Sequence, residues 1–197
     1  MAVRKGPRDF FVAAFEILES DGFPALTAAG LCDRMSVTRG SFYHHFGSFD
    51  AFVESLMRYW EERYTADPFA LVETLETDEA RRAEQILLAQ ALPHGAEAAI
   101  RVWSTVNPQV ASAQRHVDQR RLQTTVNLLR RQGLSQTDAQ TYADLAVSSL
   151  AGLQLMRRPL DGDVLRRVLS EIHSQVEGRR AMPSDLRRAR AHRGGST

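Results

Sequence analysis

Apolar residues recur at intervals of three and four positions along almost the whole chain, which is the spacing of amphipathic helices. A first stripe, in the segment from Arg8 to Ser20, contains Phe11, Phe15 and Leu18. No stretch shows the sustained alternation of apolar and polar residues that a half-buried strand would produce. We therefore predict an all-α fold of about nine helices.

Threonine, glycine and proline residues mark the expected ends of these helices. Thr27 and Thr38 are suitable N-caps, and Gly133 is a natural C-terminal stop. After the first helix, we expect helices at Ala28–Met35, Arg39–His45, Phe49–Tyr64, Asp78–Leu92, His94–Val106, Val110–Gln132, Ser135–Arg158 and Asp163–Glu177. We place the domain boundaries so that residues 1–48 form one domain, residues 49–178 form a second, and residues 179–197 form a basic tail that we expect to be disordered.

The stretch from Thr27 to Phe52 carries the candidate chemistry of the chain. Two short helices joined by about three residues have the geometry of a helix-turn-helix, whose second helix enters the major groove of DNA. Glycine inside a helix lowers helix stability by about 1 kcal/mol relative to alanine. Gly40 is nevertheless expected at an exposed helical position, which makes sense where the backbone must approach a partner closely. The alternative is a plain three-helix packing unit with an accidental polar face. That face would display side chains able to contact phosphates and base edges: Thr38, Arg39, Ser41, Tyr43 and His44.

This stretch resembles the DNA-binding domain of the TetR (tetracycline repressor) family of transcriptional regulators. The resemblance covers about the first 50 residues, and the rest of the chain is similar to the family only in the number and length of its helices. It implies a homodimer, usually a repressor, that binds a double-stranded, pseudo-palindromic DNA operator and responds to a small-molecule effector. It also implies that the last two helices pair with their copies. The matching residues are Gly22-Phe23-x-x-Leu26-Thr27, Leu31-Cys32 and Val37-Thr38-x-Gly40-Ser41-Phe42-Tyr43-x-His45-Phe46-Gly47-Ser48.

The resemblance also implies a role for each residue of the motif. The positions that usually contact phosphates are occupied by Thr27, Thr38, Tyr43 and His44, and those that read base edges by Arg39, Gly40 and Ser41. His45 is expected to be partly structural. In such proteins a basic N-terminal arm can reach a neighbouring groove, which here points to Arg4, Lys5 and Arg8.

Two positions depart from the family pattern. Ser36 occupies the turn where the family usually has glycine, and Phe49 stands where the family usually has a lysine that contacts phosphate. Residues 1–50 contain five lysines and arginines against six aspartates and glutamates. Because few phosphates would be neutralised, we expect DNA binding to depend only weakly on salt concentration.

The overall composition excludes several other classes of protein. With 25 lysines and arginines against 24 aspartates and glutamates, the chain is not a bulk polycation. Its basic residues concentrate at the two ends, so the segment between them is acidic overall. The single cysteine, Cys32, forms no internal disulfide and is expected in the core. Without a secretory leader or a membrane span in view, we expect a cytoplasmic protein with no membrane partner.

The second domain is the expected location of the effector site. A plausible lining would be Met57, Trp60, Gln90, Trp103 and Gln114, although aromatic residues at helical spacing are more often core. The acidic character of this domain hints at a neutral or cationic effector, or simply reflects a solvated surface. Neither a metal site nor a cofactor is expected, because the histidines lack ligand spacing and adjacent His44 and His45 point in different directions. No sequence motif supports an enzyme. Two rival interpretations remain: a helical ligand-binding or interaction protein that has lost DNA binding, and a helical enzyme.

Overall fold

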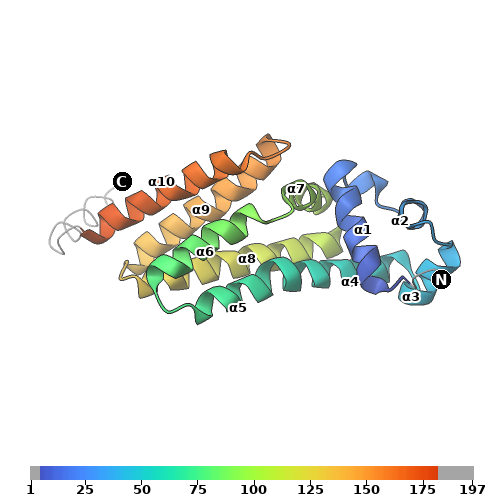
Figure 1. The fold of residues 1–197 in the computed structure, drawn as a ribbon, viewed down its shortest axis with the longest axis horizontal. Helices are drawn as coiled ribbons and strands as arrows, with labels where there is room; N and C mark the ends of the chain where they lie inside the picture. The colour runs from blue at the N-terminus through green and yellow to red at the C-terminus, as the bar shows by residue number, and fades with distance from the viewer. Residues whose placement is uncertain (1–4, 182–197) are drawn as a thin grey trace.

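The computed structural model describes residues 5–181, without the side chains of residues 69 and 73, and this part of the chain is all-α, as the sequence predicts. Figure 1 shows an elongated molecule with α1, α2 and α3 at one end and the far end of α10 at the other. The ten α-helices of the described residues are α1 (Pro7–Ser20), α2 (Ala28–Met35), α3 (Arg39–Phe46), α4 (Phe49–Glu61), α5 (Asp67–Thr74), α6 (Asp78–Gln90), α7 (His94–Trp103), α8 (Pro108–Arg131), α9 (Gln136–Met156) and α10 (Gly162–Ala181).

The first three helices form a compact unit, which we call the head, around a cluster of aromatic side chains. Phe42 of α3 is fully buried, and its ring lies 5.8 Å from that of Phe10 on α1 and 5.3 Å from that of Phe52 on α4. Phe46 contacts the same two helices through Phe10 and Phe52. Because one aromatic cluster joins α1, α3 and the start of α4, the orientation of the head is fixed relative to α4.

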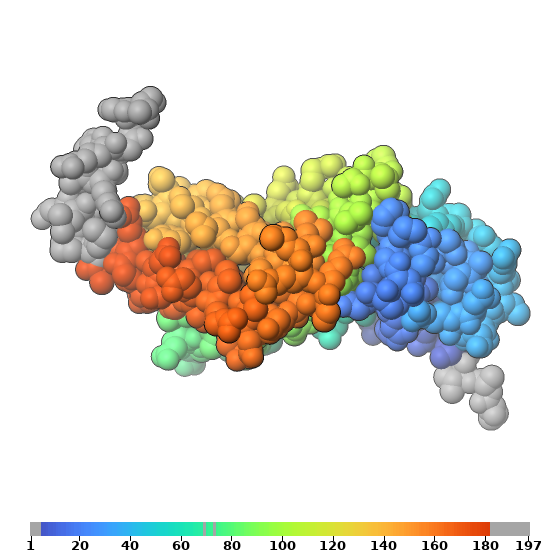
Figure 2. Space-filling view, turned by 90° about the horizontal axis from the view of Figure 1, so that it is seen from above, coloured from blue at the N-terminus to red at the C-terminus, as the bar shows by residue number. Residues whose placement is uncertain are grey.

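The remaining helices form the body, with α8 near its centre. Helix α8 contacts α4, α7 and α9, and α10 contacts α6 and α9. A second apolar cluster lies toward the far end of α8 and consists of Val126, Leu129, Leu134, Ala139, Ala143 and Val176. In the space-filling view of Figure 2, the helices of the body continue directly from the head without a gap between them. None of the helices described here combines the length and the apolar character that a membrane crossing requires.

The structure corrects the predicted end of the fourth helix. A helix from Phe49 was expected to stop near Asp67-Pro68, but α4 passes through one π-helical turn, Glu62–Ala66, and continues as α5. Pro68 lies in the first turn of α5, where a missing backbone N–H is tolerated. The extra helix is the reason that ten helices are present where about nine were expected.

The predicted end of the last helix also needs correction. Helix α10 continues through Gly178 to Ala181, so Arg179 and Arg180 are helical although the sequence assigned them to the tail. Arg179 donates from Nε to Asp138 Oδ1 on α9 at 3.0 Å, and its Nη2 atom lies 2.9 Å from the same oxygen. This ion pair stabilises a turn that glycine alone would weaken. Residues 182–197, the remainder of the predicted tail, lie outside the described part of the chain.

Candidate nucleic-acid interface and ligand cavity

Two threonine side chains and one left-handed turn build the helix-turn-helix. Thr27 Oγ1 accepts a hydrogen bond from Gly30 N–H at 3.0 Å, and Thr38 Oγ1 accepts one from Ser41 N–H at 3.3 Å. Both predicted N-caps are therefore present. Between the helices, Ser36 adopts φ 54° and ψ 45°, a left-handed conformation that glycine adopts at lower cost. The same turn lets Val37 N–H donate to Cys32 C=O at 3.0 Å, which ends α2.

The outer face of α3 is available to a partner. Arg39, Tyr43 and His44 are exposed, and 47% of Tyr43 is accessible to solvent. Arg39 makes no ion pair with any residue that the structure describes. A β-carbon added at Gly40 would lie 3.7 Å from Thr38 Oγ1, which is an ordinary contact, so packing within the chain does not require glycine there. Ser41 is partly buried, and Thr27 and Thr38 are exposed.

The backbone just before α1 contacts α3 through His45. Its Nε2 atom lies 3.1 Å from the backbone carbonyl of Lys5. Because a carbonyl only accepts, Nε2 must carry the proton, and the histidine acts as a structural donor. The Lys5 side chain is exposed, as is Arg8. Arg4, the other predicted residue of the basic arm, lies outside the described residues.

Three side chains of the head and the start of α4 are engaged in packing or ion pairing within the chain. The Phe49 ring lies 5.7 Å from Phe52 and 6.4 Å from Phe42, so the residue that replaces the family's lysine extends the aromatic core. Arg34 Nη2 lies 3.0 Å from Asp21 Oδ2, which ties α2 to the end of α1. Burial raises the pKa of the Cys32 thiol, which fits the expected core cysteine.

The head and the body are connected through α1 and α7. The Glu19 carboxylate on α1 accepts hydrogen bonds from the N–H groups of Gly95 (3.1 Å) and Ala96 (2.7 Å), the first turn of α7. A carboxylate is favourable at a helix N-terminus because the free N–H groups carry partial positive charge. Nearby, the Phe23 and Trp103 rings stack with centroids 6.2 Å apart. A shift of α7 would therefore be transmitted to α1.

A buried charged network joins α4, α7, α8 and α9 inside the body. Glu97 is 3% exposed, and both of its oxygens accept from Arg121, at 2.6 and 2.7 Å. Trp60 Nε1 donates to the same carboxylate at 3.0 Å, and Gln154 Nε2 does so at 3.3 Å. Burial alone would raise the pKa of Glu97, but the charge of Arg121 and these hydrogen bonds outweigh burial and hold it below the ordinary value.

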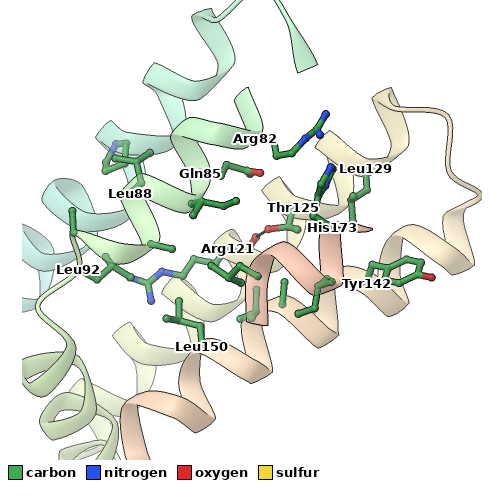
Figure 3. A pocket seen from close by; sticks show the side chains of 18 of the residues that line it. Arg82, Gln85, Leu88, Leu92, Arg121, Thr125, Leu129, Tyr142, Leu150 and His173 are labelled. Carbon is green, nitrogen blue, oxygen red and sulfur yellow. Dashed lines mark hydrogen bonds between the residues drawn. The ribbon is translucent and has the colours of Figure 1, made fainter. Parts of the chain in front are cut away.

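A cavity of about 260 Å³ opens between α6, α8, α9 and α10, as the side chains in Figure 3 show. The Arg121 stem crosses one side of the cavity, and Arg121 Nη2 reaches Tyr64 C=O at 3.5 Å near the junction of α4 and α5. Most of the lining is aliphatic, and it consists of Arg63, Tyr64, Pro68, Arg82, Gln85, Ile86, Leu88, Ala89, Ala91, Leu92, Arg121, Thr125, Leu129, Tyr142, Ala146, Val147, Leu150, Leu169, Ile172, His173 and Val176.

None of the five residues predicted to line an effector site is among the residues lining this cavity. Met57 and Trp103 are core residues, and Trp60 is buried in the Glu97 network. Gln114 Nε2 donates to Asp118 at 3.0 Å, and Gln90 Nε2 donates to Gly162 C=O at 3.2 Å. The five residues were chosen by side-chain type, and which helix faces meet could not be predicted from that choice.

Glu97 and Arg121 were not predicted, although both leave a signal in the sequence. Glu97 is a lone acid within an otherwise apolar run, Ala96 to Ile100. Arg121 follows Gln114 and Val117 at spacings of three and four, which places it on the buried stripe of α8. Charged residues at core positions of a helix are almost always paired, so the two could have been proposed as partners.

The protein thus combines a helix-turn-helix with an exposed second helix at one end and a helical body that contains a cavity at the other. Residues 10–56 match the family model for bacterial regulatory proteins of the tetR family. This match covers most of the head and the start of α4, so the head is similar to the DNA-binding domain of that family.

Solved structures share the fold of nearly the whole chain. A transcriptional regulator from Rhodococcus sp. Rha1 superposes with a TM-score of 0.74 at 17% identity, covering 91% of this chain and 100% of that one. A TetR transcriptional regulator from Legionella pneumophila gives 0.74 at 12% identity, covering 89% and 99%. A protein from Saccharomonospora viridis in complex with choline gives 0.70 at 17% identity, covering 84% and 93%. At these identities the likeness concerns the fold alone. No curated protein matches the chain significantly.

Proposed function

We propose that this protein is a homodimeric repressor that binds a pseudo-palindromic operator and leaves it when a small molecule occupies the cavity. The bare outer face of α3 is the observation that carries the proposal. Arg39 is exposed there without an ion-pair partner among the described residues, and Gly40 lacks any packing requirement for glycine. Such a face suits direct contact with the major groove, with the α3 N-terminus and the Thr38 hydroxyl near phosphates.

The surface of α9 supports the dimer. Leu145 and Leu155 are each 44% exposed and Met156 is 84% exposed, which is unusual for large apolar side chains on one helix. Ser149 and Gly152 lie on the same stripe at helical spacing and would let a second helix approach closely. A two-fold axis along this face would present two copies of α3 to two half-sites about one DNA turn apart.

The cavity and the buried network supply the route for release. Arg121 lines the cavity and also binds Glu97 on α7. The first turn of α7 in turn donates a hydrogen bond to Glu19 on α1 of the head. A ligand that prefers one arrangement of α7 would change the spacing of the two heads, and it can shift operator affinity only by that preference. The choline bound to the protein from Saccharomonospora viridis supports a small molecule as the class of effector.

The first test is selection of bound DNA from a random pool, followed by affinity measurements on two variants. We expect Arg39→Ala and Tyr43→Ala each to weaken the selected complex by roughly tenfold, because each removes contacts worth about 1–3 kcal/mol. Arg58→Ala, an exposed arginine on α4, is the matched control and should bind as the parent does. If no sequence is enriched, or if all three variants bind equally, the rival function of a helical interaction protein without DNA binding is favoured.

The salt dependence of the same complex gives a second measurement. The head carries few cations, Phe49 is packed into the core, and Arg34 is paired with Asp21. We therefore expect a shallow decrease of affinity with salt, with about three phosphates neutralised per subunit. A slope corresponding to many more phosphates would contradict this account of how the head holds DNA.

A further inference from the structure

One end of the cavity is apolar and the other end is polar. Figure 3 shows Leu92 and Leu150 at one end, and Arg82 and His173 side by side at the other. Arg82 comes from α6 and His173 from α10, so the polar end lies where these two helices meet. The apolar end would receive a hydrocarbon group and the polar end a group that accepts hydrogen bonds.

The polar end has donors that the chain itself leaves unused. Arg82 Nε is buried without a hydrogen-bond partner, and Arg82 Nη2 lies 3.7 Å from Glu177 Oε1, which is too long for a hydrogen bond. His173 Nε2 is also buried without a hydrogen bond, and it lies 3.5 Å from the same oxygen. Buried donors normally find a partner, so two unsatisfied nitrogens at the end of one cavity indicate a missing acceptor.

The charged residues that line the cavity all have one sign, and the nearest acid to its polar end, Glu177, lies outside the lining. The described lining contains three arginines and one histidine, and none of the described residues in the lining is an aspartate or a glutamate. Arg121 is already neutralised by Glu97, and Arg63 is exposed beside the Tyr64 ring. Arg82 pairs with Glu177 only at 3.7 Å, and the same Glu177 oxygen already accepts from Arg180 Nη1 at 2.8 Å, so the charge of Arg82 is only partly compensated. Burial and the neighbouring charge of Arg82 lower the pKa of His173, which leaves it a neutral donor beside a cation.

From this arrangement we infer that the cavity binds an apolar monocarboxylic acid, with its carboxylate at Arg82 and His173 and its hydrocarbon body toward Leu92 and Leu150. This inference rests on the proposed effector role of the cavity and specifies the ligand. A carboxylate accepts from arginine in charge-assisted hydrogen bonds that are roughly twice as strong as neutral ones. The volume of about 260 Å³ corresponds to roughly nine water-sized units, which fits a ligand of about ten non-hydrogen atoms.

The proposed ligand differs from the neutral or cationic effector that the acidic character of the second domain suggests. Overall charge suggested a neutral or cationic effector, but the acidic residues of the body lie elsewhere than the described lining. A quaternary ammonium ligand needs aromatic faces or carboxylates around its charge. At the polar end it would place a second positive charge beside Arg82, where the neighbouring Glu177 carboxylate already accepts from Arg180.

The test uses three probes with the same eight-carbon chain: octanoate, 1-octanol and octyltrimethylammonium. Isothermal titration of the full-length protein should give octanoate a dissociation constant about tenfold or more below that of octanol, because a charged hydrogen bond contributes more than a neutral one. Octyltrimethylammonium should bind more weakly than octanol. Equal binding of octanoate and octanol, tighter binding of the cation, or no binding of octanoate would each overturn the inference.

Variants of Arg82 test whether the carboxylate of octanoate binds at this residue. Arg82→Gln should lower octanoate affinity about tenfold and change octanol affinity little. Arg82→Lys should lose less octanoate affinity than Arg82→Gln, because lysine keeps the positive charge but not the planar set of donors. Arg166→Gln, an exposed arginine on α10 outside the lining, is the matched control for general charge. An equal loss in Arg82→Gln and Arg166→Gln would show only long-range attraction and would overturn the assignment.

Operator affinity measured with and without octanoate separates this inference from the proposed function. If octanoate binds through Arg82 and leaves operator affinity unchanged, the ligand class stands and the effector role of the cavity fails. If the protein binds its operator but no carboxylate, the ligand class fails and the DNA-binding function stands.

Discussion

The head and the body of this protein reach stability and function by different means. In the head, a cluster of aromatic rings fixes three short helices, and the polar residues stay on the outside, where a duplex can reach them. In the body, polar residues lie inside: Glu97 and Arg121 are buried together, and Arg82 and His173 face a cavity. Under the proposed function, the head needs only a rigid support for the surface that contacts DNA, whereas the body needs polar groups in its interior to recognise a small molecule.

The largest expected effect is loss of the aromatic centre of the head. Phe42→Ala should lower the free energy of unfolding by about 3–5 kcal/mol, because it removes a fully buried ring and leaves a void between α1, α3 and α4. Hydrogen exchange should show the head opening while the amides of α8 and α9 stay protected. Equal loss of protection in both regions would mean that the head and the body unfold as one cooperative unit, which would contradict this prediction.

The corresponding test of the body is Glu97→Gln. Removing the carboxylate leaves the Arg121 guanidinium buried and uncompensated, which should cost about 3–5 kcal/mol at pH 7 in denaturant unfolding. The double variant Glu97→Leu with Arg121→Met should recover part of that loss, since no buried charge remains. If the double variant is no more stable than Glu97→Gln, the cost arises from packing rather than from charge.

The pH dependence of the same variant gives the sign of the Glu97 contribution. The pKa of Glu97 in the folded state lies below its ordinary value of 4.5. Its stabilisation is therefore fully present above about pH 4.5 and is lost as the pH falls through the folded-state value. The difference in unfolding free energy between the parent and Glu97→Gln should shrink in that acidic window. A difference that stays constant down to pH 3 would contradict the depressed pKa.

On the outer face of α3, one substitution should raise the free energy of unfolding and weaken operator binding at the same time. Gly40→Ala should raise the unfolding free energy by about 1 kcal/mol, because alanine favours the helix and the added methyl meets only an ordinary contact. It should nevertheless weaken operator binding, because the added methyl group would lie on the face of α3 that we propose contacts the duplex. A variant that is more stable and binds DNA as well as the parent would remove Gly40 from the interface.

The smallest expected effect concerns the turn of the helix-turn-helix. Ser36 has a positive φ of 54°, so Ser36→Gly should stabilise the head by about 0.5–1 kcal/mol in thermal or denaturant unfolding. Operator affinity should change little, since the backbone already has the required geometry. A loss of stability would show that the left-handed conformation is not a source of strain here.

The class of fold, the helix-turn-helix and its exposed face could be predicted from the amino-acid sequence. Those features depend on residues close together in the chain: the Thr27 and Thr38 caps, the spacing of apolar positions, and a motif within residues 10–56. The tertiary structure alone decided where the cavity lies and which polar groups are buried together. Arg82 and His173 are far apart in sequence and meet only because α10 packs on α6, and Arg121 finds Glu97 only through the packing of α8 on α7. Local spacing predicts a helix and its faces, but which faces meet depends on how all the helices pack at once.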